Sequence, residues 1–252
     1  MNAGTVEWSG FYYGRSTGPW MRGGSGGATV SNNSFEYNGT GGLRLSGAGG
    51  ASVSSNTFFQ NRWEMPDGSG GGQLYFDYGA SNIFSSLNYI TGNNWQTGYS
   101  NINGCYPPPT PQAVYGVEVE PGSYNNYVWG DEITANTGAG ITATSVSSLS
   151  ISGYASGYPN YPKYIHNNAG NNPPFGNATN GIEINGASSG ITLNGILSRN
   201  NDGYAVSIQS GTSGTGWQNY HCLTSNNVYL VPPYTTSYSL SNPTPLSTGT
   251  CP

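Results

Sequence analysis

The stretch ATVSNNSFEYN (28–38) returns 23 residues later, in altered form, as ASVSSNTFFQN (51–61). Ala28, Val30, Asn33, Phe35 and Asn38 align with an alanine, a valine, an asparagine, a phenylalanine and an asparagine in the second stretch. Small, apolar and amide residues that recur at a fixed interval of about 20 to 50 residues are typical of stacked structural repeats. The pair therefore predicts a solenoid.

The second half of this pattern recurs along most of the chain. In seven places an apolar residue stands three positions before an asparagine. The apolar residues are Phe35, Phe58, Ile90, Ile133, Ile165, Leu197 and Leu223, and the asparagines are Asn38, Asn61, Asn93, Asn136, Asn168, Asn200 and Asn226. Asparagine tolerates the left-handed backbone of a tight corner, and its amide can bond to the same amide one turn along. The column predicts an asparagine ladder.

Short strands with alternating apolar residues lie on both sides of these asparagines. Those that follow occupy 42–47, 73–78, 116–121, 140–145, 181–186 and 204–209. Alternation with a period of two indicates a strand with one buried face. Three short strands per repeat, glycine and asparagine at the corners and no amphipathic helix predict an all-β, single-domain parallel β-helix.

These repeats resemble the right-handed parallel β-helix (pectate-lyase-like) superfamily, whose asparagine ladder the column of corner amides matches. The resemblance covers about residues 28–227 and implies a right-handed coil of about seven rungs. Residues 1–27 are expected to form an N-terminal cap or a degenerate first rung, and residues 228–252 an irregular C-terminal tail. Members of the superfamily include glycoside hydrolases and Ca²⁺-dependent polysaccharide lyases, so the resemblance implies a carbohydrate partner but not one reaction.

The composition is poor in charge. Only 7% of the residues are charged, whereas 40 are glycine and 30 are asparagine. A net charge of −5 with six Lys and Arg residues argues against nucleic acid and anionic membranes, which need clustered cations. The start MNAGTVEWSG resembles no signal peptide. We expect an extracellular, secreted or cell-surface protein whose signal was removed, or a piece of a longer chain.

The outward residues of the third strand of each rung form two predicted columns. The first contains Arg44, Tyr75, Glu118, Thr142, Glu183 and Ser207, and the second contains Ser46, Asp77, Glu120, Thr144, Asn185 and Gln209. Four of the eleven acidic residues lie here, and they are the candidate catalytic residues: Asp77, Glu118, Glu120 and Glu183. At a rung spacing of about 4.8 Å, Asp77 and Glu120 are about 5 Å apart, and Glu118 and Glu183 about 9.6 Å. Retaining glycosidases place two carboxyls about 5 Å apart, and inverting ones about 6.5–9.5 Å.

Three insertions leave the corner before this strand, at 62–72, 94–115 and 169–180. Insertions in solenoids often line the binding face, and aromatic side chains on them can stack against sugar rings. The candidate substrate-binding residues are Trp63, Tyr75, Trp95, Tyr106, Phe175 and Arg44.

Together these features favour a glycoside hydrolase acting on a neutral polysaccharide, without a cofactor. An acidic face with few cations repels a polyuronate unless Ca²⁺ bridges the two. One alternative is a non-catalytic structural or adhesive module, such as a surface fibre subunit or an adhesin domain, with the acids as a solvated face. Another is a Ca²⁺-dependent lyase or a phage tailspike-like depolymerase. The chain is accordingly expected to be a monomer or to self-assemble.

Overall fold

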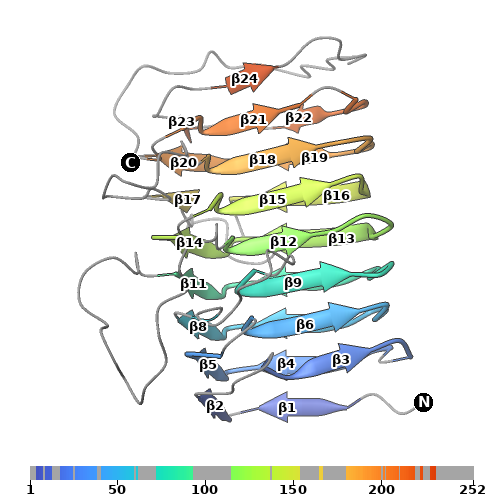
Figure 1. Ribbon diagram of the computed structural model, residues 1–252, viewed down its shortest axis with the longest axis vertical. Coiled ribbons are helices and arrows are strands. Elements are labelled where there is room, and N and C mark those ends of the chain that lie inside the picture. Colours follow the sequence, from blue (N-terminus) through green and yellow to red (C-terminus); the bar gives the residue numbers. More distant parts are fainter. Residues whose placement is uncertain are drawn as a thin grey trace, which may run out of the picture.

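The protein is a stack of flat coils made of short parallel strands (Figure 1). The computed structural model describes residues 4–7, 9–12, 18–24, 26–38, 41–59, 61, 72–92, 115–136, 138–153, 165–166, 180–199, 201, 203–209, 211–218, 222–223 and 228–230. These residues form three parallel sheets of eight strands each. Within them, no helix has the length and apolar character needed to cross a bilayer.

Each sheet collects one strand from every turn of the coil. Sheet A contains β1 (Thr5–Glu7), β4 (Thr29–Ser31), β7 (Ser52–Ser54), β10 (Phe84–Ser86), β13 (Tyr124–Trp129), β16 (Ser147–Ser152), β19 (Thr192–Asn194) and β22 (Gly216–Gln218). Sheet B contains β2 (Gly10–Tyr12), β5 (Ser34–Glu36), β8 (Thr57–Phe59), β11 (Tyr89–Thr91), β14 (Glu132–Thr134), β17 (Ile165–His166), β20 (Leu197–Arg199) and β23 (Cys222–Leu223). Sheet C contains β3 (Trp20–Arg22), β6 (Leu43–Ser46), β9 (Leu74–Asp77), β12 (Val117–Val119), β15 (Ile141–Thr144), β18 (Ile182–Asn185), β21 (Val206–Ile208) and β24 (Val228–Leu230).

The chain passes through sheets A, B and C in turn, so three consecutive strands make one rung and the structure has eight rungs. On the N-terminal side, strands β1, β2 and β3 pair with β4, β5 and β6 and form a first rung, which is one of the two alternatives that the sequence predicts for residues 1–27. The irregular tail expected from the sequence begins at residue 228, whereas β24 at Val228–Leu230 still pairs with β21.

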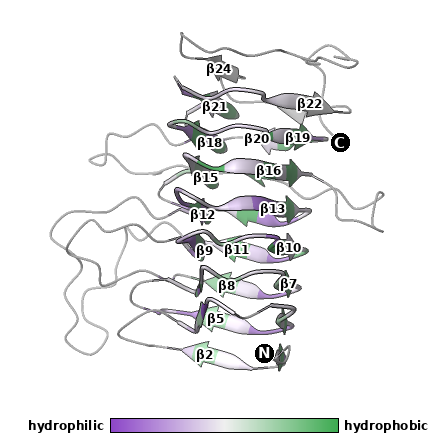
Figure 2. Ribbon diagram, turned by 90° about the vertical axis from the view of Figure 1, so that its right-hand side faces the viewer, coloured by the Kyte–Doolittle hydropathy of each residue, from purple (hydrophilic) through white to green (hydrophobic). Residues whose placement is uncertain are grey.

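Apolar side chains fill the interior because alternate residues of each strand point inward. The alternation of hydrophobic and hydrophilic colour along the strands is visible in Figure 2. Within sheet B, Phe11, Phe35 and Phe58 lie on successive rungs and their rings stack with centroid distances of 5.0 and 4.8 Å. Ile90, Ile133 and Ile165 continue this column, as the repeat pattern predicts.

The predicted column is wrong by one residue on the next rung. Ile165 pairs with Ser198 rather than with Leu197, and Asn201 is a buried corner amide on this rung. The Ser198 hydroxyl is buried, donates to the Ala205 carbonyl at 3.1 Å and accepts from Asn201 Nδ2 at 3.0 Å. A hydroxyl whose hydrogen bonds are all made can lie inside the coil. A search for apolar residues does not detect such a position.

The predicted asparagine ladder is present at the corner between sheets B and C. Asn38 Nδ2 donates to Asn61 Oδ1 at 2.8 Å, and Asn61 Nδ2 donates to Gln73 Oε1 at 2.8 Å. A glutamine that precedes β9 therefore supplies the third amide. Four of the asparagines expected in this column lie outside the described residues: Asn93, Asn168, Asn200 and Asn226.

A second ladder, which the motif search does not predict, lies at the corner between sheets A and B. Nδ2 of Asn33, Asn56 and Asn88 donates to Oδ1 of the residue one rung along, at 3.0, 3.0 and 2.9 Å. The last acceptor is Asp131, whose Oδ2 also accepts a 2.6 Å hydrogen bond from the Ser85 hydroxyl. A carboxylate thus ends a column of buried amides.

The Asp131 carboxyl makes stability depend on pH. Burial raises its pKa to about 6, although hydrogen bonds from Ser85 and Asn88 oppose this shift. Between about pH 4 and pH 6 the unfolded carboxyl is ionised and the folded one still holds its proton, so the unfolding free energy falls as pH rises, by about 3 kcal/mol. We expect Asp131→Asn to remove this slope and to unfold at higher denaturant concentration than the wild type at pH 7. Urea titrations of both proteins from pH 4 to 8 measure the effect, and parallel curves would contradict it.

Candidate functional site

The outer face of sheet C carries the two columns predicted from the sequence. Pairing between neighbouring strands confirms the order of the first column, which runs Arg44, Tyr75, Glu118, Thr142, Glu183 and Ser207, and adds Trp20 before it on the first rung. In the second column, Ser46 pairs with Asp77, and Thr144 pairs with Asn185. The strand alternation and the corner residues therefore place all four candidate carboxylates on one face.

Arg44 and Asp77 form an ion pair across neighbouring rungs. Both Nε and Nη2 of Arg44 donate to Asp77 Oδ2, the former at 2.9 Å. The Asp77 side chain is 0% exposed and that of Arg44 is 22% exposed. Within the described part of the chain, Asp77 Oδ1 has no hydrogen-bond partner. Because its charge is committed to Arg44, we assign Asp77 a positioning role and not the part of a free acid or base.

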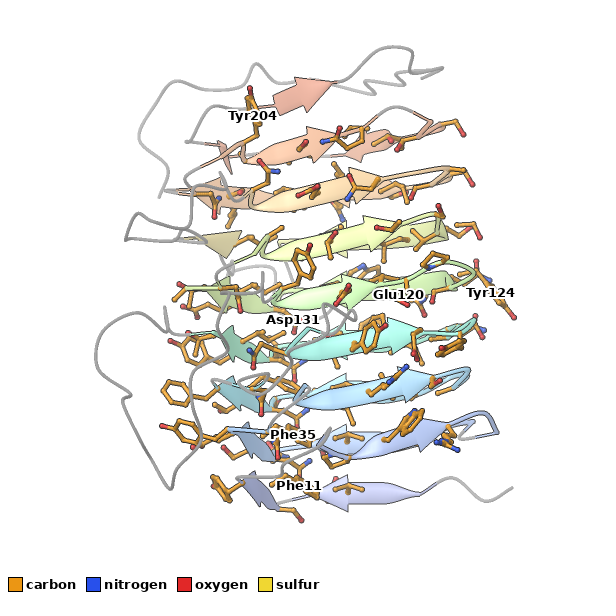
Figure 3. All side chains as sticks on the ribbon, viewed as in Figure 1. Phe11, Phe35, Glu120, Tyr124, Asp131 and Tyr204 are labelled. Carbon is orange, nitrogen blue, oxygen red and sulfur yellow. The ribbon has the colours of Figure 1, made fainter. Side chains whose placement is uncertain are left out.

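Tyr75 connects this ion pair to the acidic part of the face. Its ring lies 5.0 Å from the Arg44 guanidinium carbon, and its hydroxyl interacts with the Glu120 carboxylate. Burial, this interaction and the charges of Glu120, Glu118 and Asp77 all raise the pKa of Tyr75. The hydroxyl therefore stays protonated beside the Glu120 carboxylate. Glu118 is the Tyr75 neighbour in the first column and is buried, whereas Glu120 is half-exposed (Figure 3).

Glu183 lies two rungs from Glu118, in the same column. Asn180 Nδ2 donates to its Oε2 at 3.2 Å, and Asn185 Nδ2 donates to its Oε1 at 3.1 Å. Two amides thus orient this half-buried carboxylate. Thr142 separates it from Glu118, so the acids form a pair, Glu118 in β12 and Glu120 directly after it, and a single group on β18.

Two exposed aromatic residues on this face are not among the substrate-binding residues predicted from the sequence. Trp20 belongs to the first rung, which the repeat pattern does not resolve, and Tyr78 directly follows β9. Arg44 lies between them, with its guanidinium carbon 4.6 Å from the Trp20 ring and 5.7 Å from the Tyr78 ring. Continuing the first column by one rung toward the N-terminus identifies Trp20 from the sequence.

The four aromatic loop candidates lie outside the described residues: Trp63, Trp95, Tyr106 and Phe175. The described chain places both ends of each insertion at the corner between sheets B and C, because the insertions connect β8 to β9, β11 to β12 and β17 to β18. They therefore start and finish beside the outer face of sheet C.

Within the described ranges, the acids of this face do not gather as a group of metal ligands. Ca²⁺ takes about six to eight oxygen ligands. Asp77 is bound to Arg44, and Glu183 is held by two amides. Across the described ranges, no group of three or more His, Cys, Asp and Glu side chains could hold a metal ion.

Comparison with known proteins places this architecture in a family. The sequence pattern of the right-handed β-helix region matches residues 2–155. The chain belongs to the right-handed β-helix family. No curated protein matches this β-helix protein in sequence.

Two solved structures have a similar fold. The full-length tailspike protein 2 from Escherichia coli O157:H7 bacteriophage CAB120 matches with a TM-score of 0.52 and 16% identity, over 79% of this chain and 24% of the tailspike chain. A mutant of the periplasmic alginate epimerase AlgG matches with a TM-score of 0.53 and 14% identity, over 93% of this chain and 50% of the epimerase. The β-helix protein therefore spans half or less of each neighbour, and at these identities the likeness shows the fold alone.

Proposed function

We propose that this β-helix protein acts outside the cytoplasm on a polysaccharide that lies along the outer face of sheet C, and that it hydrolyses the chain at Glu118 and Glu120. The observation that carries the proposal is the pair of glutamates at Glu118 in β12 and Glu120 directly after it, the second of them beside the Tyr75 hydroxyl. The AlgG neighbour, an epimerase named for alginate, supports a polysaccharide as the class of partner.

The spacing of Glu118 and Glu120 suits inverting hydrolysis. Residues two apart along a strand point to the same side, and their Cα atoms are about 6.6 Å apart. From such Cα positions two glutamate side chains can place their carboxyls about 6.5–9.5 Å apart, the separation in inverting glycosidases, which leaves room for a water molecule. Asp77 and Glu120 are closer, but the Arg44 ion pair removes Asp77 from a retaining mechanism.

The reaction needs only these two groups and water. One carboxyl protonates the glycosidic oxygen while the bond from that oxygen to the anomeric carbon breaks. The other carboxylate removes a proton from the water that attacks the anomeric carbon from the opposite face. The products are a new reducing end and a new non-reducing end, and both carboxyls regain their starting protonation after proton exchange with solvent.

The charges of the face favour a neutral glycan. Arg44 is paired with Asp77, and the other described arginine on sheet C is Arg22, on the first rung. The rungs from β12 to β21 carry glutamates, threonines, serine and amides, which suit hydroxyl groups better than carboxylates.

A polysaccharide screen with matched variants tests the proposal. We expect the wild type to release reducing ends from at least one neutral polysaccharide in a set containing galactomannan, xyloglucan, xylan and mixed-linkage β-glucan. Glu118→Gln and Glu120→Gln should each lower this rate by at least about 100-fold, because each removes a proton-transfer group. Glu132→Gln on sheet B serves as the control and should keep full activity. Full activity in both site variants would refute the assignment.

The same screen separates hydrolysis from elimination. Alginate and polygalacturonate are included, with Ca²⁺ or with a chelator, and the absorbance of unsaturated products is recorded. Unsaturated products that require Ca²⁺ would replace the hydrolase with a lyase. Reducing ends without this absorbance would support hydrolysis.

A non-catalytic assembly module is a second candidate function, and exposed tyrosines on the other two sheets favour it. Tyr12 and Tyr89 lie on sheet B and Tyr124 on sheet A, and all three are at least 43% exposed. Light scattering measures the mass of the purified protein. Open-ended assembly without cleavage of any polysaccharide would favour the module, whereas an active monomer would favour the hydrolase.

A further inference from the structure

We propose that Tyr78 and Trp20 form a binding position for a sugar ring at the N-terminal end of the outer face of sheet C. This inference rests on the proposed function and extends it by one site, directly beside the rung that carries Glu118 and Glu120. Tyr78 provides the ring on which the sugar stacks, and Trp20 provides a flanking contact.

The backbone of Tyr78 is the first observation. Its φ is 47°, in the left-handed region that a bulky residue rarely adopts. The equivalent corner positions after β6, β15 and β18 hold Gly47, Ser145 and Gly186, which have positive φ as well. Tyrosine therefore stands at a corner position where these three other rungs use glycine or serine.

Burial does not explain this choice. Tyr78 is 75% exposed, so its ring gains little from packing against the protein. Residues with a strained backbone cluster at functional sites, where the strain can be part of the function. The tyrosine also follows Asp77, which places it on the rung directly before that of Glu120.

The residues around Tyr78 hold its ring and the ring of Trp20 in place beside Arg44. Trp20 is 42% exposed, and its ring and that of Tyr78 both lie within 6 Å of the Arg44 guanidinium carbon. Arg22 also covers the Trp20 ring, at 3.7 Å from its centroid. Since Asp77 fixes Arg44, the two exposed rings are oriented before any ligand binds, which reduces the entropy lost on binding.

The chemistry of this surface fits a carbohydrate. Aromatic rings with an apolar face and a polar edge suit a sugar, which presents C–H groups on one face and hydroxyls around its rim. A polysaccharide that follows the stack of rungs from Trp20 toward Glu183 would place one unit on Tyr78 and an adjacent bond near Glu118 and Glu120.

A purely structural role for Tyr78 and a role in binding predict opposite effects on stability when Tyr78 is replaced with glycine. If Tyr78 only shielded the Arg44–Asp77 ion pair from water, replacing it with glycine would lower the melting temperature. If it is a strained binding residue, Tyr78→Gly removes the strain and should raise Tm by about 2–4 °C.

Affinity electrophoresis and calorimetry of the full chain test the inference. Gels contain galactomannan, xyloglucan, xylan, mixed-linkage β-glucan, alginate or polygalacturonate. We expect Tyr78→Gly to bind the retained polysaccharide at least tenfold more weakly than wild type while its Tm rises, and Trp20→Ala to weaken binding by a smaller factor. Tyr89→Ala, which removes a 43% exposed tyrosine from sheet B, is the matched control and should bind as wild type.

Each outcome decides between the claims. Unchanged binding by Tyr78→Gly, in a wild type that does bind, would overturn the inference and leave the proposed function standing. Equal losses in Tyr78→Gly and Tyr89→Ala would also overturn it. Absence of wild-type binding to every polysaccharide would count against the proposed function and the inference together.

Discussion

Asn56→Ala is expected to lower the free energy of unfolding by about 4 kcal/mol. The Asn56 side chain is buried, and its Oδ1 accepts hydrogen bonds from Asn33 N and Nδ2 at 2.9 and 3.0 Å. Its Nδ2 donates to the Val30 carbonyl at 2.9 Å and to Asn88 Oδ1 at 3.0 Å. Alanine deprives the Asn33 amide and the Val30 carbonyl of these partners, and a buried group without its partner costs about 1–3 kcal/mol.

Chemical denaturation followed by far-ultraviolet circular dichroism measures this loss. The matched control is Asn82→Gly, which removes an exposed asparagine side chain at a corner with a φ of 54°. Glycine adopts this backbone without strain, so the control should be as stable as wild type or slightly more stable. A loss below about 1 kcal/mol in Asn56→Ala would show that the ladder contributes little to stability.

Arg44→Met is expected to cost about 3 kcal/mol, and more than Asp77→Asn. Removing Arg44 leaves the charge of Asp77 without a partner, and Asp77 is fully buried. Removing the charge of Asp77 instead leaves Arg44, which is partly exposed and can be solvated by water. The difference in exposure between the two partners therefore makes the losses unequal.

The double variant Arg44→Met/Asp77→Asn isolates the cost of the unpaired charge. Because neither charge remains, we expect it to be more stable than Arg44→Met alone when both are unfolded in urea at pH 7. If Arg44→Met and Asp77→Asn lose the same stability, or if the double variant is the least stable, burial of the unpaired carboxylate is not the cause.

The face with the candidate site could be predicted because strands impose a simple geometry. Glu118, Glu120 and Glu183 are assigned to one face from alternation alone, and the observed register confirms the columns from Arg44 to Ser207. Side chains of a strand alternate strictly between its two faces, and glycine and asparagine mark where each strand ends.

The same reasoning does not extend to positions where polar groups take interior or corner roles. The motif of an apolar residue before asparagine does not find Ser198 and Asn201, because their hydrogen bonds make a polar residue acceptable inside the coil. The second ladder includes Asn33 and Asn56, which the opening repeat aligns, but it ends at Asp131, which a search for asparagine alone does not detect.

The sequence by itself determined a parallel β-helix, one of its amide ladders and the face on which the acids lie. These follow from periods along the chain, which are local properties of the backbone. Only the tertiary structure decided that Asp77 is paired with Arg44, that the Tyr75 hydroxyl lies beside Glu120 and that Tyr78 is both strained and exposed. These features depend on side-chain rotamers and on burial between rungs separated by loops of variable length, and no local pattern specifies them.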